Sequence, residues 1–108
     1  MRTIADKQFP YEYYITNHLP KGFTFDEHYG CYPRVLASVE DPKAAKELIN
    51  AELLINHFSE ELVEVNAYDE YKDVELVFDL LLFTESKMKE CLELVNNVLT
   101  EANQLVWN

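Results

Sequence analysis

The sequence predicts an α+β fold in which an antiparallel sheet carries two helices on one face. Apolar and acidic residues alternate in two runs within 60–83, which a short polar stretch joins, as is typical of a β-hairpin. Apolar residues recur every three or four positions in 42–57 and again after Thr84, as is typical of amphipathic helices. A chain of 108 residues can build one hydrophobic core, so we expect a single α+β domain over 1–108.

The hairpin has one apolar face, because successive side chains of a strand point to opposite sides of the sheet. The turn falls at 69–72, about four residues, which suits an antiparallel pair. The second strand becomes apolar on both faces at 80–83, so we expect either the N-terminal segment or another copy of the chain to cover it there, and we predict a homodimer. The predicted apolar face consists of Val63, Val65, Ala67, Val74, Leu76, Phe78, Leu80 and Leu82.

The opposite face of the hairpin is acidic. Antiparallel sheets commonly leave one face in water. Residues two apart on a strand are about 6.6 Å apart, so the carboxylates would form a regular negative ladder. The predicted partner-binding residues are this ladder and the turn, namely Glu64, Asp69, Glu70, Asp73, Glu75 and Asp79.

A strand and a helix precede the hairpin. Residues 34–39 have strand composition, and Asp41 followed by Pro42 is typical of a helix N-terminus. We expect this helix to continue to about His57, where the histidine serves as a polar residue at the helix end. Its predicted core stripe is Leu48, Ala51, Ile55 and Phe58, preceded by Ala44 and Ala45 and widened by Leu53 and Leu54.

The last predicted helix begins after Thr84, a favourable N-cap residue. Its apolar positions continue for six turns, and Cys91 among them is interpreted as a small core residue. The predicted stripe is Met88, Cys91, Leu92, Val95, Val98, Leu99, Ala102 and Leu105.

The order from residue 34 is therefore β-α-β-β-α, preceded by one or two weak strands at 11–16 and 23–25, with a loop at 29–33. This order is ferredoxin-like in outline. That fold has a further strand after the last helix, for which no residues remain. The acidic hairpin followed by a long terminal helix also resembles small acidic secretion-chaperone domains, which implies a dimeric chaperone or adaptor.

The net charge of −11 lies almost wholly in the middle of the chain. Residues 40–80 hold twelve acidic and three basic side chains, whereas residues 1–39 hold four of each. Direct binding of nucleic acid or of an anionic membrane is therefore disfavoured, and a basic protein partner is favoured. The alternative interpretation is that the charge only maintains solubility.

The sequence shows no motif for catalysis or for a cofactor, and we expect neither enzymatic activity nor a bound metal. His28 and Cys31 have a spacing that a metal could use, or that a thiol and its base could use, but only His18 lies nearby as a further ligand. Two glycines in the chain disfavour a glycine-rich phosphate loop. The first nine residues lack the apolar run of a signal peptide, and no run reaches the length of a membrane helix, so we expect a cytoplasmic protein.

Three functions fit these features. The first is a small acidic inhibitor whose surface occupies the basic cleft of a nucleic-acid-binding enzyme, as a DNA mimic does. Phage proteins directed against restriction or CRISPR enzymes, and immunity-type proteins, belong to this class. The second is a dimeric chaperone or adaptor that uses apolar surfaces, with the N-terminal tyrosines and Trp107 at an interface. The alternative for these aromatic residues is that the tyrosines cover the sheet and Trp107 closes the core. The third is a small-ligand-binding α+β domain.

Overall fold

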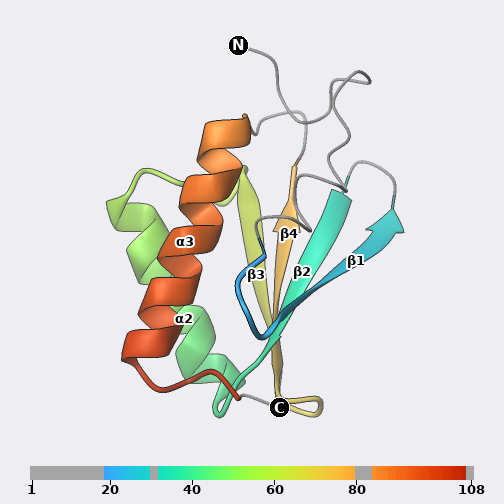
Figure 1. Cartoon of the computed structure of the whole chain (residues 1–108), viewed down its shortest axis with the longest axis vertical. Helices are drawn as coiled ribbons and strands as arrows, with labels where there is room; N and C mark the ends of the chain where they lie inside the picture. Colours follow the sequence, from blue (N-terminus) through green and yellow to red (C-terminus); the bar gives the residue numbers. More distant parts are fainter. Residues whose placement is uncertain (1–18, 30–31, 80–83, 107–108) are drawn as a thin grey trace.

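A four-stranded antiparallel sheet carries two helices on one of its faces, as Figure 1 shows. The computed structural model describes residues 19–29, 32–79 and 84–106, with the backbone alone at 26–29, 32–33 and 85. The predicted α+β class and element order are confirmed. The elements are β1 (Phe23–Tyr29), β2 (Tyr32–Ser38), α2 (Pro42–Ile55), β3 (Val63–Tyr68), β4 (Asp73–Phe78) and α3 (Glu85–Glu101).

The sheet has the order β1-β2-β4-β3. Both β2 and β3 pair antiparallel with β4, so β2 and β3 run parallel to each other with β4 between them. The segment β2-α2-β3 is thus a split βαβ unit, the building block of ferredoxin-like folds. The position beside β2 is filled by β1, which comes from before the unit. After α3, Leu105 forms a single bridge with Val39 at the end of β2.

The predicted hairpin is formed by β3 and β4. Tyr68 pairs with Asp73, which leaves the predicted four-residue turn at 69–72. The core face is also confirmed, since Val63, Val65, Val74, Leu76 and Phe78 are buried. Leu80–Phe83 lies outside the described residues, so the homodimer expected from it stays a prediction.

The start of α2 follows the predicted local rules. The Asp41 carboxylate accepts a hydrogen bond from the Ala44 amide at 3.2 Å, and Pro42 occupies the first turn. The helix ends at Ile55, two residues earlier than predicted. His57 then takes a left-handed conformation with φ 66°, and the Phe58 amide donates to the Leu53 carbonyl at 2.8 Å. His57 therefore does belong to the helix end.

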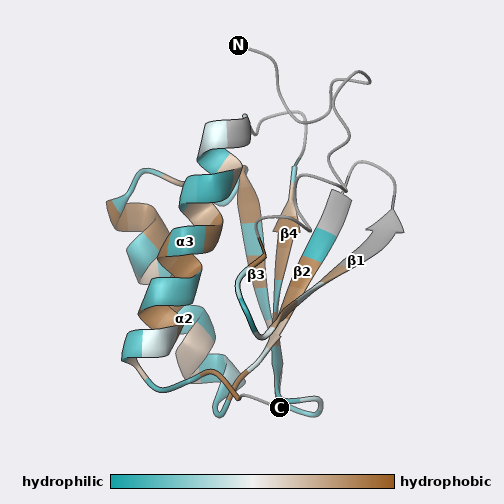
Figure 2. Cartoon of the chain, viewed as in Figure 1, coloured by the Kyte–Doolittle hydropathy of each residue, from teal (hydrophilic) through white to brown (hydrophobic). Residues whose placement is uncertain are grey.

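The core stripe predicted for α2 is only partly correct, because Ala45 and Leu53 are buried but the residues at its centre are not. Leu48 and Ile55 are 36% and 71% exposed, and Ala51 is also exposed, although Phe58 beyond the helix is buried. Leu54 is 73% exposed, so the hydrophobic end of α2 lies at the outside of the helix layer (Figure 2). The helix presents a neighbouring apolar stripe to the sheet, which consists of Pro42, Ala45, Ile49 and Leu53.

The last helix, α3, is capped by Thr84 as predicted, because the Thr84 hydroxyl accepts from the Lys87 amide at 3.3 Å. The predicted stripe is confirmed through Leu99 but is wrong beyond it. The helix ends at Glu101, Ala102 is exposed, and Asn103 takes a positive φ of 56°. Leu105 is buried outside the helix, in the bridge to Val39.

The N-terminal third contains one described strand, β1. It extends over Phe23–Tyr29 and so is longer than the predicted segment 23–25. The backbone pairing of Tyr29 with Tyr32 shows that strands reach into the region predicted as a loop at 29–33. The other predicted strand, 11–16, lies outside the described residues.

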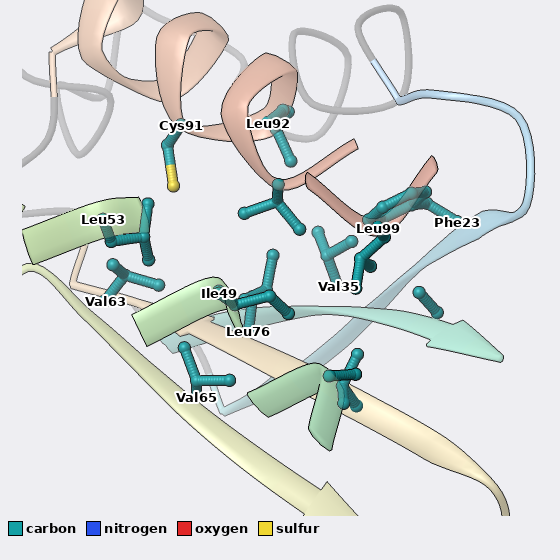
Figure 3. Close-up of a cluster of buried hydrophobic side chains, with 14 of the residues drawn as sticks. Phe23, Val35, Ile49, Leu53, Val63, Val65, Leu76, Cys91, Leu92 and Leu99 are labelled. Carbon is teal, nitrogen blue, oxygen red and sulfur yellow. The ribbon is translucent and has the colours of Figure 1, made fainter. Parts of the chain in front are cut away.

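The hydrophobic core fills the space between the helices and the sheet, as Figure 3 shows. Ile49 and Leu53 of α2 and Leu92 and Leu99 of α3 enter it from the helices, and strand residues such as Leu76 enter it from the sheet. Among the described residues, no helix is both long and apolar enough to cross a membrane. Both helices lie on one face of the sheet, and in the part of the chain that the structure describes no helix lies on the other face.

Candidate functional site: the open face of the sheet

The face of the sheet opposite the helices is organised around Glu75, in the middle of β4. Leu36 of β2 pairs with Glu75 on one side, and Asn66 of β3 pairs with it on the other. Arg34 and Tyr68 lie two residues further along β2 and β3, on the same face, so each reaches Glu75 diagonally. The alternation of side chains along three strands thus directs four polar groups to one place.

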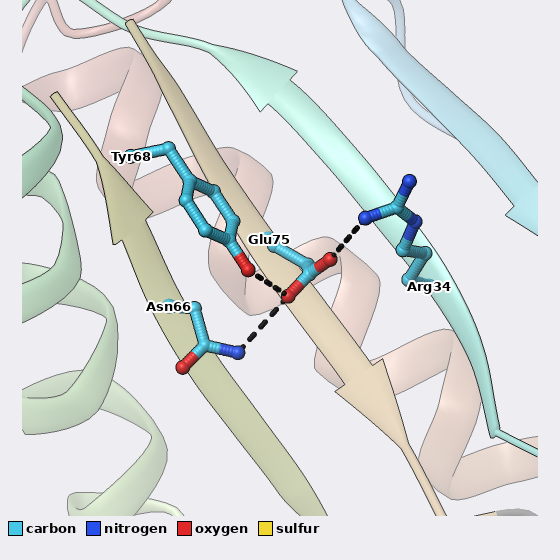
Figure 4. Close-up of polar contacts among 4 residues, drawn as sticks. All are labelled: Arg34, Asn66, Tyr68 and Glu75. Atoms are coloured by element: carbon cyan, nitrogen blue, oxygen red, sulfur yellow. Dashed lines mark hydrogen bonds and ion pairs between the residues drawn. The ribbon is translucent and has the colours of Figure 1, made fainter. Parts of the chain in front are cut away.

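Three side chains donate hydrogen bonds to the Glu75 carboxylate (Figure 4). Arg34 Nη1 lies 2.7 Å from Glu75 Oε2. Asn66 Nδ2 and Tyr68 Oη lie 3.0 Å and 2.9 Å from Glu75 Oε1. Glu75 is only 4% exposed, so its charge is neutralised within the sheet and is not presented to solvent.

The network lowers the pKa of Glu75. Burial alone raises the pKa of this carboxyl, but the hydrogen bonds from Arg34, Asn66 and Tyr68 stabilise the ionised form and more than offset burial. The pKa of Tyr68 is raised, mainly because its hydroxyl donates to the Glu75 carboxylate and would lose that bond on ionisation. Glu75 is therefore held ionised and Tyr68 is held neutral.

The lowered pKa predicts that Glu75 contributes to stability in a pH-dependent way. The unfolded chain binds a proton at this carboxyl near its ordinary pKa of 4.5, whereas the folded chain binds it only at lower pH. The contribution is therefore complete above the unfolded pKa and is lost as the pH falls through the folded pKa. We expect the Tm of the wild type to fall more steeply than that of Glu75→Gln below about pH 5.

Thermal unfolding followed by circular dichroism between neutral and acid pH measures this difference. Glu93→Gln is the matched control, because Glu93 is exposed on α3 and lies on the helix side of the sheet. Protonation of the other carboxylates affects all three proteins alike. Parallel Tm curves for the wild type and Glu75→Gln would contradict the assigned role of Glu75.

The expectation of a continuous acidic ladder on this face is wrong, because Glu75 is buried and paired. Asp73 and Asp79 are half-buried, and the Ser38 hydroxyl donates to Asp73 Oδ1 at 3.2 Å. Glu64 is exposed but lies at the far end of β3, where it lines a small hollow together with Lys46 of α2. The six predicted residues therefore do not form an unbroken row of exposed negative charge.

The turn of the hairpin brings the other predicted residues together. Asp69 and Glu70 are exposed there, and Asp73 begins β4 directly after the turn. None of the three forms an ion pair within the described part of the chain. We call Asp69, Glu70 and Asp73 the hairpin-tip acids.

A hollow of about 280 Å³ lies beside the hairpin-tip acids on the open face. Sequence reasoning missed it as a site, although the alternation of β3 does place Tyr68 on this face. Arg34 could not be found from local pattern, since 41 residues separate it from Glu75. The hollow is lined by Arg34, Leu36, Tyr68, Tyr71 and Asp73.

The other chemistry weighed from the sequence finds little support in the described residues. They contain no group of three or more histidine, cysteine, aspartate or glutamate side chains placed to hold a metal ion. The side chains of His18, His28 and Cys31 lie outside the described residues. Cys91 is fully buried, and burial raises the pKa of its thiol to about 12, so it is a core residue and a poor nucleophile.

Comparison of the chain with protein-family models, with curated proteins and with solved structures finds no match in any of the three.

Proposed function

We propose that this chain is a small acidic protein-binding inhibitor, without catalytic activity, that acts in the cytoplasm. Its hairpin tip binds a basic surface such as the nucleic-acid-binding cleft of an enzyme. The observation that carries this proposal is the group of hairpin-tip acids, Asp69, Glu70 and Asp73, which form no ion pair within the described chain and outnumber the one lysine of the turn, Lys72. With a net charge of −11, the chain would be attracted to a basic protein and repelled by nucleic acid.

The hairpin tip is held in place by backbone hydrogen bonds. The Tyr71 amide donates to the Tyr68 carbonyl at 3.2 Å, which closes the turn. The Lys72 carbonyl accepts from the Val39 amide at 2.8 Å, which ties the turn to the end of β2. A turn whose backbone is already ordered loses less conformational entropy on binding, so the carboxylates that it carries can substitute for the phosphates of a nucleic acid.

A capture experiment from the lysate of the source cells tests the proposal. The tagged wild type should retain a basic, nucleic-acid-binding protein at low salt and release it at high salt, because salt screens charge attraction between exposed groups. The double variant Asp69→Lys with Glu70→Lys should lose that protein at low salt.

The matched control is Glu93→Lys with Glu101→Lys, which changes the net charge equally on exposed positions of α3. It should retain the partner. Equal loss with both variants would mean that total charge matters and the hairpin tip does not. Equal retention with both would contradict the proposed surface.

A second candidate function is an adaptor or chaperone that uses an apolar surface. The observation that favours it is the exposure of Leu54 and Ile55, at 73% and 71%, at the end of α2. This function predicts a partner that survives high salt in the same experiment. That partner should be lost from Leu54→Ser with Ile55→Ser and kept by the hairpin-tip variant.

A further inference from the structure

The hollow on the open face has aromatic and aliphatic walls. Leu36 contributes from β2, and the rings of Tyr68 and Tyr71 contribute from the end of β3 and from the turn. Tyr68 is 38% exposed, and its hydrogen bond to Glu75 fixes its ring. Tyr71 is 69% exposed and so leaves much of its ring available for contact. Such walls suit a flat group or the apolar stem of a long side chain.

The charge in and around the hollow is negative. Arg34 lines it, but its guanidinium is paired with Glu75, so the two charges compensate each other. Asp73 Oδ1 accepts from Ser38, and the other carboxylate oxygen has no hydrogen bond within the described chain. Asp69 and Glu70 on the adjoining turn add two negative charges, of which the exposed Lys72 in the same turn offsets one. A carboxylate with a free acceptor beside two tyrosine rings is complementary to a cation.

The size and chemistry of the hollow favour one kind of cation, an arginine side chain. Pockets for small-molecule ligands commonly have volumes of about 300–1,000 Å³, so a hollow of about 280 Å³ suits a single side chain better than a drug-sized molecule. Arginine fits its chemistry better than lysine does. A planar guanidinium stacks on aromatic rings and donates paired hydrogen bonds to a carboxylate, whereas an ammonium acts as a point charge.

We propose that the hollow lined by Leu36, Tyr68, Tyr71 and Asp73 receives an arginine side chain of the basic partner. The guanidinium stacks on Tyr71 and donates to Asp73, and the aliphatic stem covers Leu36. This inference rests on the proposed function for the source of the arginine. It adds a specific anchor to a surface that otherwise attracts any basic protein.

A titration followed by nuclear magnetic resonance tests the hollow without the partner. The full chain, labelled with nitrogen-15, is titrated with the blocked peptide acetyl-Gly-Arg-Gly-amide and separately with its citrulline analogue, which is neutral and nearly the same shape. The arginine peptide should produce saturable shifts at the amides of Leu36, Tyr71 and Asp73, with a Kd of about 1–10 mM for so small a ligand. The citrulline peptide should not.

Two variants locate the binding. Tyr71→Ala and Asp73→Asn should each weaken binding of the arginine peptide by about fivefold or more. Glu93→Gln should leave it unchanged. Tyr71 is largely exposed and asparagine can still accept from Ser38, so both variants should keep the dispersed spectrum of the folded chain. Absence of saturable shifts at the three amides, or equal binding of the two peptides, would overturn the proposal.

The outcomes separate this inference from the proposed function. If Asp69→Lys with Glu70→Lys loses the captured partner while Tyr71→Ala and Asp73→Asn retain it fully, the hollow is not the anchor but the acidic tip still binds. If the arginine peptide binds as expected and no basic partner is captured, the hollow is an arginine-binding site but the proposed function is wrong.

Discussion

Replacing Arg34 by methionine is expected to destabilise the protein by about 2–4 kcal/mol, because it leaves the Glu75 carboxylate buried without its cationic partner. Glu75 is 4% exposed, and Arg34 supplies the shortest of its three hydrogen bonds, at 2.7 Å. Methionine keeps much of the aliphatic stem of arginine, so the change removes mainly the charge. A domain of this size typically has 5–15 kcal/mol of total stability, so the loss should be readily measured.

Urea denaturation of four proteins measures this effect: the wild type, Arg34→Met, Glu75→Gln and the double variant. Once Glu75 has been replaced by the neutral glutamine, Arg34→Met should lower the free energy of unfolding by less than it does in the wild type. The sum of the stability losses in the two single variants should therefore exceed the loss in the double variant, because both single changes remove the same interaction. Additive effects would show that Arg34 and Glu75 do not stabilise each other.

The second large effect is expected at Ile49, and Ile55 on the same helix provides its control. Ile49 is fully buried between α2 and the sheet, so Ile49→Ala removes core contacts and leaves a cavity, at a cost of about 2–5 kcal/mol. Ile55 is 71% exposed, so Ile55→Ala should change stability by less than about 0.5 kcal/mol. The same substitution in the same helix thus distinguishes its two apolar stripes.

The free energy of unfolding of both variants, measured in urea, shows which apolar stripe of α2 is buried. If Ile55→Ala proved as costly as Ile49→Ala, then Ile55 would be covered in solution, either by a second copy of the chain or by another segment. Light scattering on the same samples would distinguish these two cases, since only the first doubles the mass. Small effects at both positions would contradict the packing of α2 on the sheet.

Much of the fold is predictable because the signals for it are local. The alternation of β3 and β4 fixes their faces and the four-residue turn between them, since a shift by one residue would bury the acidic side. Asp41 with Pro42, and Thr84, mark the helix starts because a cap requires only residues within one turn.

The choice of the core face of α2 was not predictable from the same kind of signal. Leu48 and Ile55 recur at helical spacing just as Ile49 and Leu53 do, so the periodicity permits two stripes. Only packing against the sheet distinguishes them, since Ile49 and Leu53 share the core with strand residues such as Leu76. Leu105 similarly continues the period of α3 but pairs with Val39 instead.

The candidate site was predictable only in part. The acidity of the hairpin turn is a property of consecutive residues, and Asp69 and Glu70 are exposed as expected. The burial and pairing of Glu75 depend on Arg34, which lies on β2. The hairpin sequence alone therefore could not show that the charge of Glu75 is neutralised.

The sequence by itself determined the α+β class, the hairpin with its apolar face, the helix starts and the excess of negative charge in 40–80. Each of these depends on neighbours within a few positions or on composition alone. Only the tertiary structure decided which stripe of α2 is buried, that β1 takes the place beside β2, and that Glu75 is neutralised while Asp69 and Glu70 are not. These outcomes depend on contacts between distant segments, for which spacing along the chain carries no signal.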